Sequence, residues 1–174
     1  MAKTSLVMTV LGQDRPGLVE SLSRVVVENG GNWIESRMAH LAGQFAGIVR
    51  VEVDADQAGR LTDALRGLDR EGLDLIIHSD EAPPHAPRPT PGLVKLELIG
   101  QDRPGIVSEI TRVLTSHGVN VEDLTTECVT APTTGQQLFQ ASAKLQLPSG
   151  AAETALRKDL EKIAADLMVD ITIE

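Results

Sequence analysis

The sequence Gly12-Gln13-Asp14-Arg15-Pro16-Gly17 returns unchanged as Gly100-Gln101-Asp102-Arg103-Pro104-Gly105. Each copy follows an apolar run and precedes a stretch with the spacing of an amphipathic helix. The similarity continues beyond the hexapeptide at the same offset of 88 residues, which relates Val19 to Val107, Arg24 to Arg112, Gly30 to Gly118 and Asn32 to Asn120. Self-similarity at a fixed offset indicates that one module is used twice.

The composition of the 174-residue chain bounds its function. A formal net charge of −9, with 16 Lys and Arg against 25 Asp and Glu, argues against direct nucleic-acid binding, which depends on cations that neutralise phosphates. No apolar run is long enough for a membrane span, and the N-terminus predicts a first strand rather than a signal peptide. The single cysteine, Cys128, rules out an internal disulfide and favours a reducing, cytoplasmic location.

Residues 81–91 hold five of the nine prolines and predict a linker in an extended polyproline conformation. The linker would separate a first domain, residues 1–80, from a second domain, residues 92–174. Small domains of this size gain stability when they pack against another surface, so a homo-oligomer is one open arrangement.

Apolar spacing predicts the same order of elements in both halves, β-α-β-β-α-β. In the first half, strand 5–11 is apolar enough to be buried on both faces, and the hexapeptide leads into a helix that stops at Gly30-Gly31. The remaining elements are a hairpin of strands 32–41 and 44–53, a helix over 57–70 and a strand over 73–78. This order predicts an α+β fold of two ferredoxin-like modules, each a four-stranded antiparallel sheet with two helices on one face.

The hexapeptide admits a structural and a functional interpretation. Pro16 suits the first turn of a helix, Asp14 could cap the free N–H groups of that turn, and Gly17 permits a close backbone approach. These roles leave Gln13 and Arg15 unexplained. A helix N-terminus can bind a carboxylate, and an aspartate beside it can receive an ammonium group. Together these features suit a free amino acid, and both interpretations stay open for each copy.

The arrangement strand, G-x-D-R-P-G-[LI]-V, helix, G-[GV]-N, strand resembles the ACT domain, a small regulatory module that commonly binds amino acids. Two such modules in tandem most resemble the family of glycine cleavage system transcriptional repressors. The resemblance implies effector binding at the loop between the first strand and first helix and near the start of the second strand, often across an interface between modules. The implied ligand-binding residues are Gly12, Gln13, Asp14, Arg15, Pro16, Gly17 and Asn32, and Gly100, Gln101, Asp102, Arg103, Pro104, Gly105 and Asn120. Without the resemblance, Asn32 and Asn120 are better interpreted as turn residues after glycine.

No other pattern predicts chemistry. The four histidines are dispersed, without partners at metal-ligand spacing, and Cys128 has no nearby base in the sequence, so we expect no catalytic residue, metal or cofactor. We expect a non-enzymatic, cytoplasmic regulator that senses a small amino acid, with glycine the first candidate by resemblance. Its output would be repression of transcription through a protein partner such as a DNA-binding regulator. The alternatives are a ligand-independent interaction module and, less favoured, a small hydrolase or transferase that uses Asp14 and Arg15.

Overall fold

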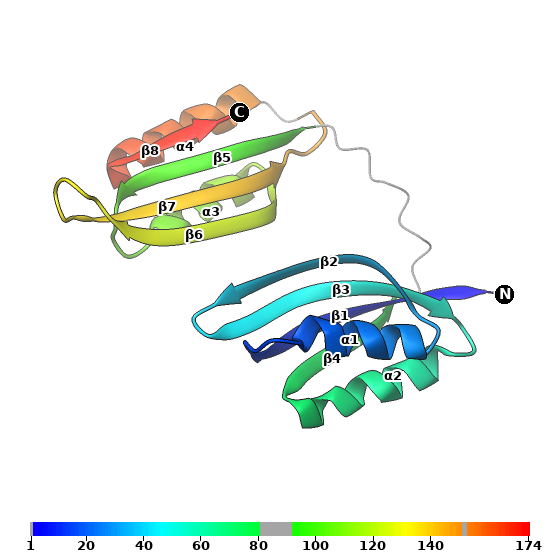
Figure 1. Ribbon diagram of the computed structural model, residues 1–174. Coiled ribbons are helices and arrows are strands. Elements are labelled where there is room, and N and C mark those ends of the chain that lie inside the picture. The colour runs from blue at the N-terminus through cyan, green and yellow to red at the C-terminus, as the bar shows by residue number, and fades with distance from the viewer. Residues whose placement is uncertain (1, 81–91, 151–152) are drawn as a thin grey trace. The chain divides into compact units, whose positions relative to one another are not determined.

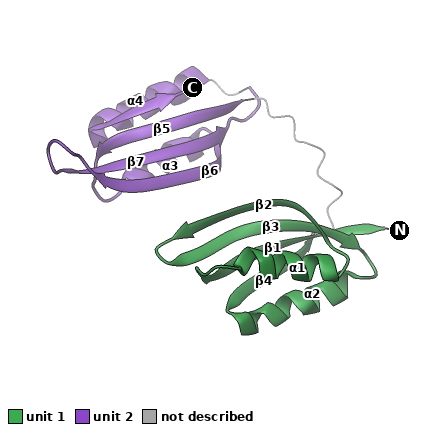
Figure 2. Ribbon diagram, in the orientation of Figure 1, with its two compact units in different colours: residues 1–86 green, residues 87–174 purple. Residues whose placement is uncertain are grey.

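The computed structural model describes residues 2–80, 92–150 and 153–174 (Figure 1). The chain divides into two compact units, residues 1–86 and 87–174 (Figure 2). The predicted linker, residues 81–91, lies outside the described residues, so its polyproline conformation and the domain limits drawn from it remain predictions.

The first unit consists of one sheet with its helices on one face (Figure 1). Its elements are β1 (Lys3–Gln13), α1 (Leu18–Glu28), β2 (Asn32–Leu41), β3 (Gln44–Asp54), α2 (Ala58–Arg66), the 3-10 helix η1 (Gly67–Glu71) and β4 (Leu73–Asp80). The strand order is β2-β3-β1-β4, and every neighbouring pair is antiparallel. The hairpin turns at Ala42 and Gly43, whose φ values of 50° and 78° suit a two-residue turn between twisted strands.

The second unit repeats this topology with the strand order β6-β7-β5-β8. Its elements are β5 (Leu93–Gln101), α3 (Ile106–Ser116), β6 (Asn120–Thr130), β7 (Gln137–Gln146), α4 (Glu153–Leu167) and β8 (Val169–Ile173). The β6–β7 connection, residues 131–136, is longer than the β2–β3 turn, residues 42–43. The α+β, ferredoxin-like prediction is confirmed for both units.

Each unit has its own apolar core between the sheet and the helices. In the first unit, alternate residues of the central strands meet Leu18, Leu22 and Val26 of α1 and Leu61 and Leu65 of α2. In the second unit the same layer contains Leu96, Leu98, Ile106, Ile110, Leu145, Leu156 and Leu160. No helix in the described ranges is long and apolar enough to cross a membrane.

The prediction that strand 5–11 is buried on both faces is wrong. Leu6, Met8 and Val10 are buried, whereas Thr9 is exposed and Leu11 is 45% exposed. The helices cover only one face of the sheet, so the strand must alternate despite its apolar sequence.

The first glycine of each hexapeptide lies where two strands come into close contact. Gly12 pairs with Leu73 at the start of β4, and a Cβ at Gly12 would lie 2.9 Å from the Gly72 carbonyl oxygen and 3.1 Å from Leu73 Cδ2. At Gly100 the added atom would lie 2.8 Å from Val169 Cα, at the start of β8. Any side chain would force the two strands apart, so this glycine has a packing role.

We expect Gly12→Ala to lower the free energy of unfolding of the first unit by about 1–3 kcal/mol, because its methyl group would overlap backbone. Gly59→Ala is the matched control. Gly59 lies in α2, and an added Cβ would meet nothing within 4 Å, so this change should raise stability by about 0.5 kcal/mol. Urea unfolding followed by circular dichroism measures both, and equal effects of the two variants would contradict the packing role.

Candidate functional site

Each hexapeptide runs from the end of one strand into the first helix of its unit and is attached to the neighbouring hairpin. The Asp14 N–H donates to the Gly43 carbonyl at 3.0 Å, and the Asp102 N–H donates to the Gln137 carbonyl at 3.0 Å. The chain then reverses at Gly17 and Gly105, whose φ values are 89° and 95°. Positive φ of this size favours glycine, so this second glycine is needed for the reversal.

The structure corrects two details of the predicted cap. The N-cap residues are Gly17 and Gly105, so Pro16 and Pro104 precede the helices instead of occupying their first turns. Neither N-cap makes a side-chain hydrogen bond, so Asp14 and Asp102 do not cap. The first intrahelical bonds run from the Ser21 N–H to Gly17 and from the Glu109 N–H to Gly105, both at 2.9 Å. The N–H groups before these remain available as donors at the helix ends.

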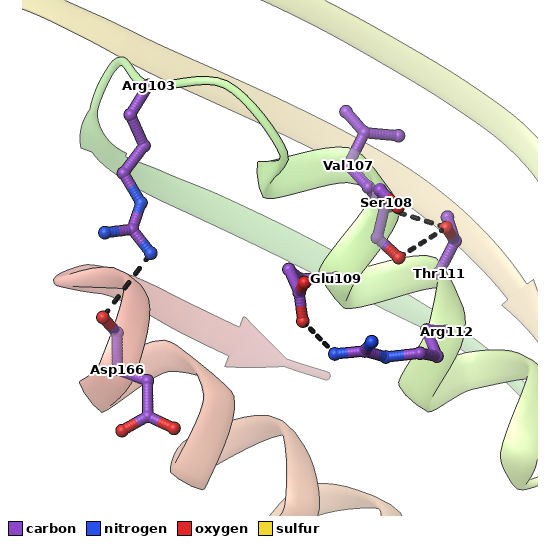
Figure 3. Close-up of polar contacts among 7 residues, drawn as sticks. All are labelled: Arg103, Val107, Ser108, Glu109, Thr111, Arg112 and Asp166. Atoms are coloured by element: carbon purple, nitrogen blue, oxygen red, sulfur yellow. Dashed lines mark hydrogen bonds and ion pairs between the residues drawn. The ribbon is translucent and has the colours of Figure 1, made fainter.

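The arginine of each hexapeptide has a structural partner that sequence analysis missed. Arg15 Nη2 donates to the Glu71 carbonyl at 2.5 Å, and Arg103 Nη2 donates to the Asp166 carbonyl at 3.4 Å (Figure 3). Both acceptors lie in the last turn of the helical segment that precedes the final strand, where a cation also interacts favourably with the helix dipole. The arginine therefore fixes the loop to the second helix of its unit.

The aspartate of each hexapeptide faces the same position of the neighbouring edge strand. Asp14 Oδ2 lies 3.6 Å from His40 Nε2 near the end of β2. Cys128 of β6 lies 88 residues after His40 and is close enough to Asp102 for that carboxylate to influence its pKa. Local desolvation raises the pKa of Cys128 above its ordinary value, and the Asp102 carboxylate raises it further.

Both glutamines of the hexapeptides end their strands with exposed side chains. Gln13 pairs with Gln44 and Gln101 pairs with Leu138 through the backbone. Fold requirements therefore explain the glycines and the arginine, but they do not explain the identity of the glutamine or the aspartate. The part of the site with no structural explanation consists of Gln13, Asp14, their copies and the helix N–H groups.

The structure does not bring Asn32 together with the hexapeptide of its own unit. Asn32 pairs with Glu52, which is level with Ser5, and Ser5 is eight residues from Gln13 along β1. At roughly 3.4 Å per residue this separation is about 27 Å. Asn120 lies equally far from Gln101 and donates to Glu122 Oε1 at 2.7 Å. Both asparagines begin strands, so their interpretation as turn residues is wrong; Gly30 and Gly118, with φ of 75° and 67°, make the turns.

Hollows lie on the sheet faces that the helices do not cover. One of about 380 Å³ in the second unit is lined by Glu97, Glu127, Asp170 and neighbouring Thr, Ser and Gln side chains. No hexapeptide residue lines it. In the part of the chain that the structure describes, no three His, Cys, Asp or Glu side chains are placed to hold a metal ion.

Comparison with known proteins agrees with this geometry. The chain is 28% identical over 150 residues to the glycine cleavage system transcriptional repressor of Escherichia coli K12, covering 86% of this chain and 77% of that protein. It is 26% identical to phosphoserine phosphatase SerB2 of Mycobacterium tuberculosis over 99% of this chain but only 41% of the enzyme. A crystal structure of an unknown protein from Galdieria sulphuraria superposes with a TM-score of 0.86 at 29% identity, covering 99% of this chain and 98% of that one.

Family models give the assignment for each unit separately. Residues 4–78 match one ACT domain model and residues 94–161 match another. The two matches fall on the two sheets with their helices and together cover most of the sequence. The chain therefore belongs to the ACT domain family and contains two ACT domains in tandem.

Proposed function

We propose that this protein is a regulator that binds a small amino acid at its hexapeptide loops and passes the signal to a protein partner. The observation that carries the proposal is the repeated pairing of helix N–H donors, which no side chain caps, with an aspartate that the fold does not require. The donors suit the effector's carboxylate and the aspartate suits its ammonium group. The similarity to a glycine cleavage system transcriptional repressor favours glycine or a close relative as effector and transcription as the controlled process.

A site that includes both a hexapeptide and an asparagine would need residues from two modules. Within one module about 27 Å separates Asn32 from Gln13, far more than the length of an amino acid. An effector that contacts both a hexapeptide loop and an asparagine must therefore take the two from different modules. Binding would then change how modules pair, to the extent that the effector binds one arrangement better than another.

The proposed partner is a protein, for example a DNA-binding regulator, and the proposed location is the cytoplasm. With 25 acidic residues against 16 basic ones, the net charge of −9 is unfavourable for contacts with nucleic-acid phosphates. We propose that the protein has no enzymatic activity. The similarity to the phosphatase covers less than half of that enzyme, and Arg15, the basic member of the alternative catalytic pair, donates to a helix carbonyl.

The rival function is a ligand-independent interaction module. Its support is that the glycines and the arginine of the hexapeptide all have structural roles. The two functions differ in one measurable property, since only a sensor binds a free amino acid.

We expect titration calorimetry against a panel of free amino acids to give saturable binding for glycine or another small member. Asp14→Ala or Asp102→Ala should weaken that binding about tenfold or more, because each removes a charge-assisted contact to the ammonium group. Asp63→Ala is the control and should leave binding unchanged, because it removes an exposed aspartate of α2 whose side chain pairs with Arg66 of the same helix. Absence of heat and of thermal shift for every amino acid would leave the interaction module as the function.

A second pair of variants separates structural from binding roles inside the loop. Arg15→Ala should lower the free energy of unfolding of the first unit by about 1 kcal/mol, because the carbonyl at the end of the second helix loses its donor. Asp14→Ala should leave stability nearly unchanged, because its only described side-chain partner is His40 at 3.6 Å between half-exposed groups. Urea unfolding and calorimetry on the same samples measure both effects. Loss of stability in Asp14→Ala equal to that in Arg15→Ala would make the aspartate structural.

We also expect the isolated protein to leave the mobility of promoter DNA unchanged in gel electrophoresis at low salt, with or without effector, because its charge is unfavourable for phosphate contacts. A retarded band that weakens as salt is added would show direct DNA binding and remove the need for a partner protein.

A further inference from the structure

The second unit contains an apolar crevice between α3 and the sheet. A cavity of about 30 Å³ is lined by residues of α3, β5, β6 and β7. The one polar side chain in this lining is Thr111, whose hydroxyl donates to the Val107 carbonyl of its own helix at 2.8 Å. Val107 and Leu124 are 41% and 46% exposed and form the rim, and Val107 lies on the side of α3 away from α4 (Figure 3). A space without polar partners holds water poorly and suits an apolar group.

The first unit has larger side chains at the matching interior positions. Val121 of β6 occupies the position of Trp33, and Ala143 of β7 occupies the position of Val49. Trp33 packs against the core of the first unit, and Val49 is buried in it. Tryptophan is larger than valine and valine is larger than alanine, so the second unit has less side-chain volume beside its first helix. The crevice therefore arises from the side chains of the second unit and not from the topology that both units share.

The rim of the crevice changes in the opposite direction. Leu124 stands where the first unit has Ser36, because each pairs with the position that carries Ala143 in β7 or Val49 in β3. The second unit thus combines a small residue inside with a large apolar residue at the entrance. An unfilled cavity and an exposed leucine both lower the stability or solubility of an isolated domain. An apolar group that enters between Val107 and Leu124 would remove both costs.

The crevice adjoins the proposed effector site of its unit. Its lining includes Ile106 and Val107, the first two residues of α3, whose N–H groups precede the first intrahelical bond. Its lining also includes Phe139, which pairs with Cys128 on β6. Cys128 is in turn close enough to Asp102 for that carboxylate to influence its pKa. The helix donors, the aspartate and the crevice therefore lie together at one end of the unit.

We propose that the second ACT domain selects an amino acid with a short aliphatic side chain, such as valine, and holds that side chain in the crevice. The inference rests on the proposed function, in which the carboxylate binds the helix N–H groups and the ammonium group binds Asp102. A cavity of about 30 Å³ has room for about two or three methyl-sized groups, which matches the three side-chain carbons of valine. The first unit, with Trp33 and Val49 in place, keeps glycine as its effector.

Calorimetry on variants that each retain one intact loop tests this selectivity. Asp14→Ala leaves the second loop intact, and this variant should bind valine at least about tenfold more tightly than glycine. Each buried methyl or methylene group contributes about fourfold in affinity, so burial of part of the side chain is enough. Asp102→Ala leaves the first loop intact, and this variant should bind valine no more tightly than glycine.

A variant that fills the crevice tests the location of the side chain. Ala143→Val, made in the Asp14→Ala protein, installs the valine of the first unit and should reduce the preference for valine over glycine to below about threefold. Ala165→Val adds the same two methyl groups at an exposed position of α4 and is the matched control, so it should leave the preference unchanged. Leu124→Ser installs the serine of the first unit at the half-exposed rim without changing the core. It should reduce the preference by about threefold or more.

Circular dichroism confirms that each variant is folded. Equal affinities of Asp14→Ala for glycine and valine would overturn the inference and leave the sensing function standing. A preference for valine that both Ala143→Val and Leu124→Ser leave intact would do the same. Absence of binding by every amino acid would instead overturn the proposed function, and this inference with it.

Discussion

The helices of each unit cover only one face of a four-stranded antiparallel sheet, and most other features follow from this one-sided packing. The side chains of a strand alternate between faces, so Leu6, Met8 and Val10 of β1 and Leu96 and Leu98 of β5 point to the same face and fill the core. The remaining residues face outward and are free of the core. Packing of the core therefore determines the residues on one face of the sheet, whereas it leaves the residues on the other face free to vary. The two units agree on the first side and differ on the second.

The same packing explains why the hexapeptide combines several tasks in six residues. The first glycine allows the start of the last strand to approach, and the last glycine reverses the chain into the helix. The arginine reaches the end of the second helix and joins the loop to it. These three positions fix the loop at the end of the sheet where the β2–β3 hairpin also turns. The aspartate is left on a rigid support beside helix N–H groups that no side chain caps, and the proposed effector site would be held in place in this way.

Much of the fold could be predicted from the sequence because the repeat confirmed each element twice. Periodicity located the helices, and Ala42-Gly43 located the hairpin. The predictions that failed concerned contacts and backbone angles, which the spacing of apolar residues does not reveal. The role of Arg15 requires a carbonyl 56 residues away, and the absence of an aspartate cap depends on the φ angle of Gly17. The sequence also placed Asn32 just after the first helix without indicating that the full length of β1 separates it from Gln13.

The differences between the two units are as informative as their similarity. A substitution in the core changes packing and is costly, whereas one on an uncovered face has little effect on stability unless another molecule binds there. Duplicated modules that had no external contacts would therefore be expected to acquire polar residues on both uncovered faces. The second unit carries Ser142 and Thr172 where the first carries Ile48 and Ile76, although it keeps Ile99 at the position of Leu11. Two isoleucines more than half exposed at matched positions lower solubility without helping the core. The residues of an uncovered sheet face can therefore differ between two units that share the same core layer.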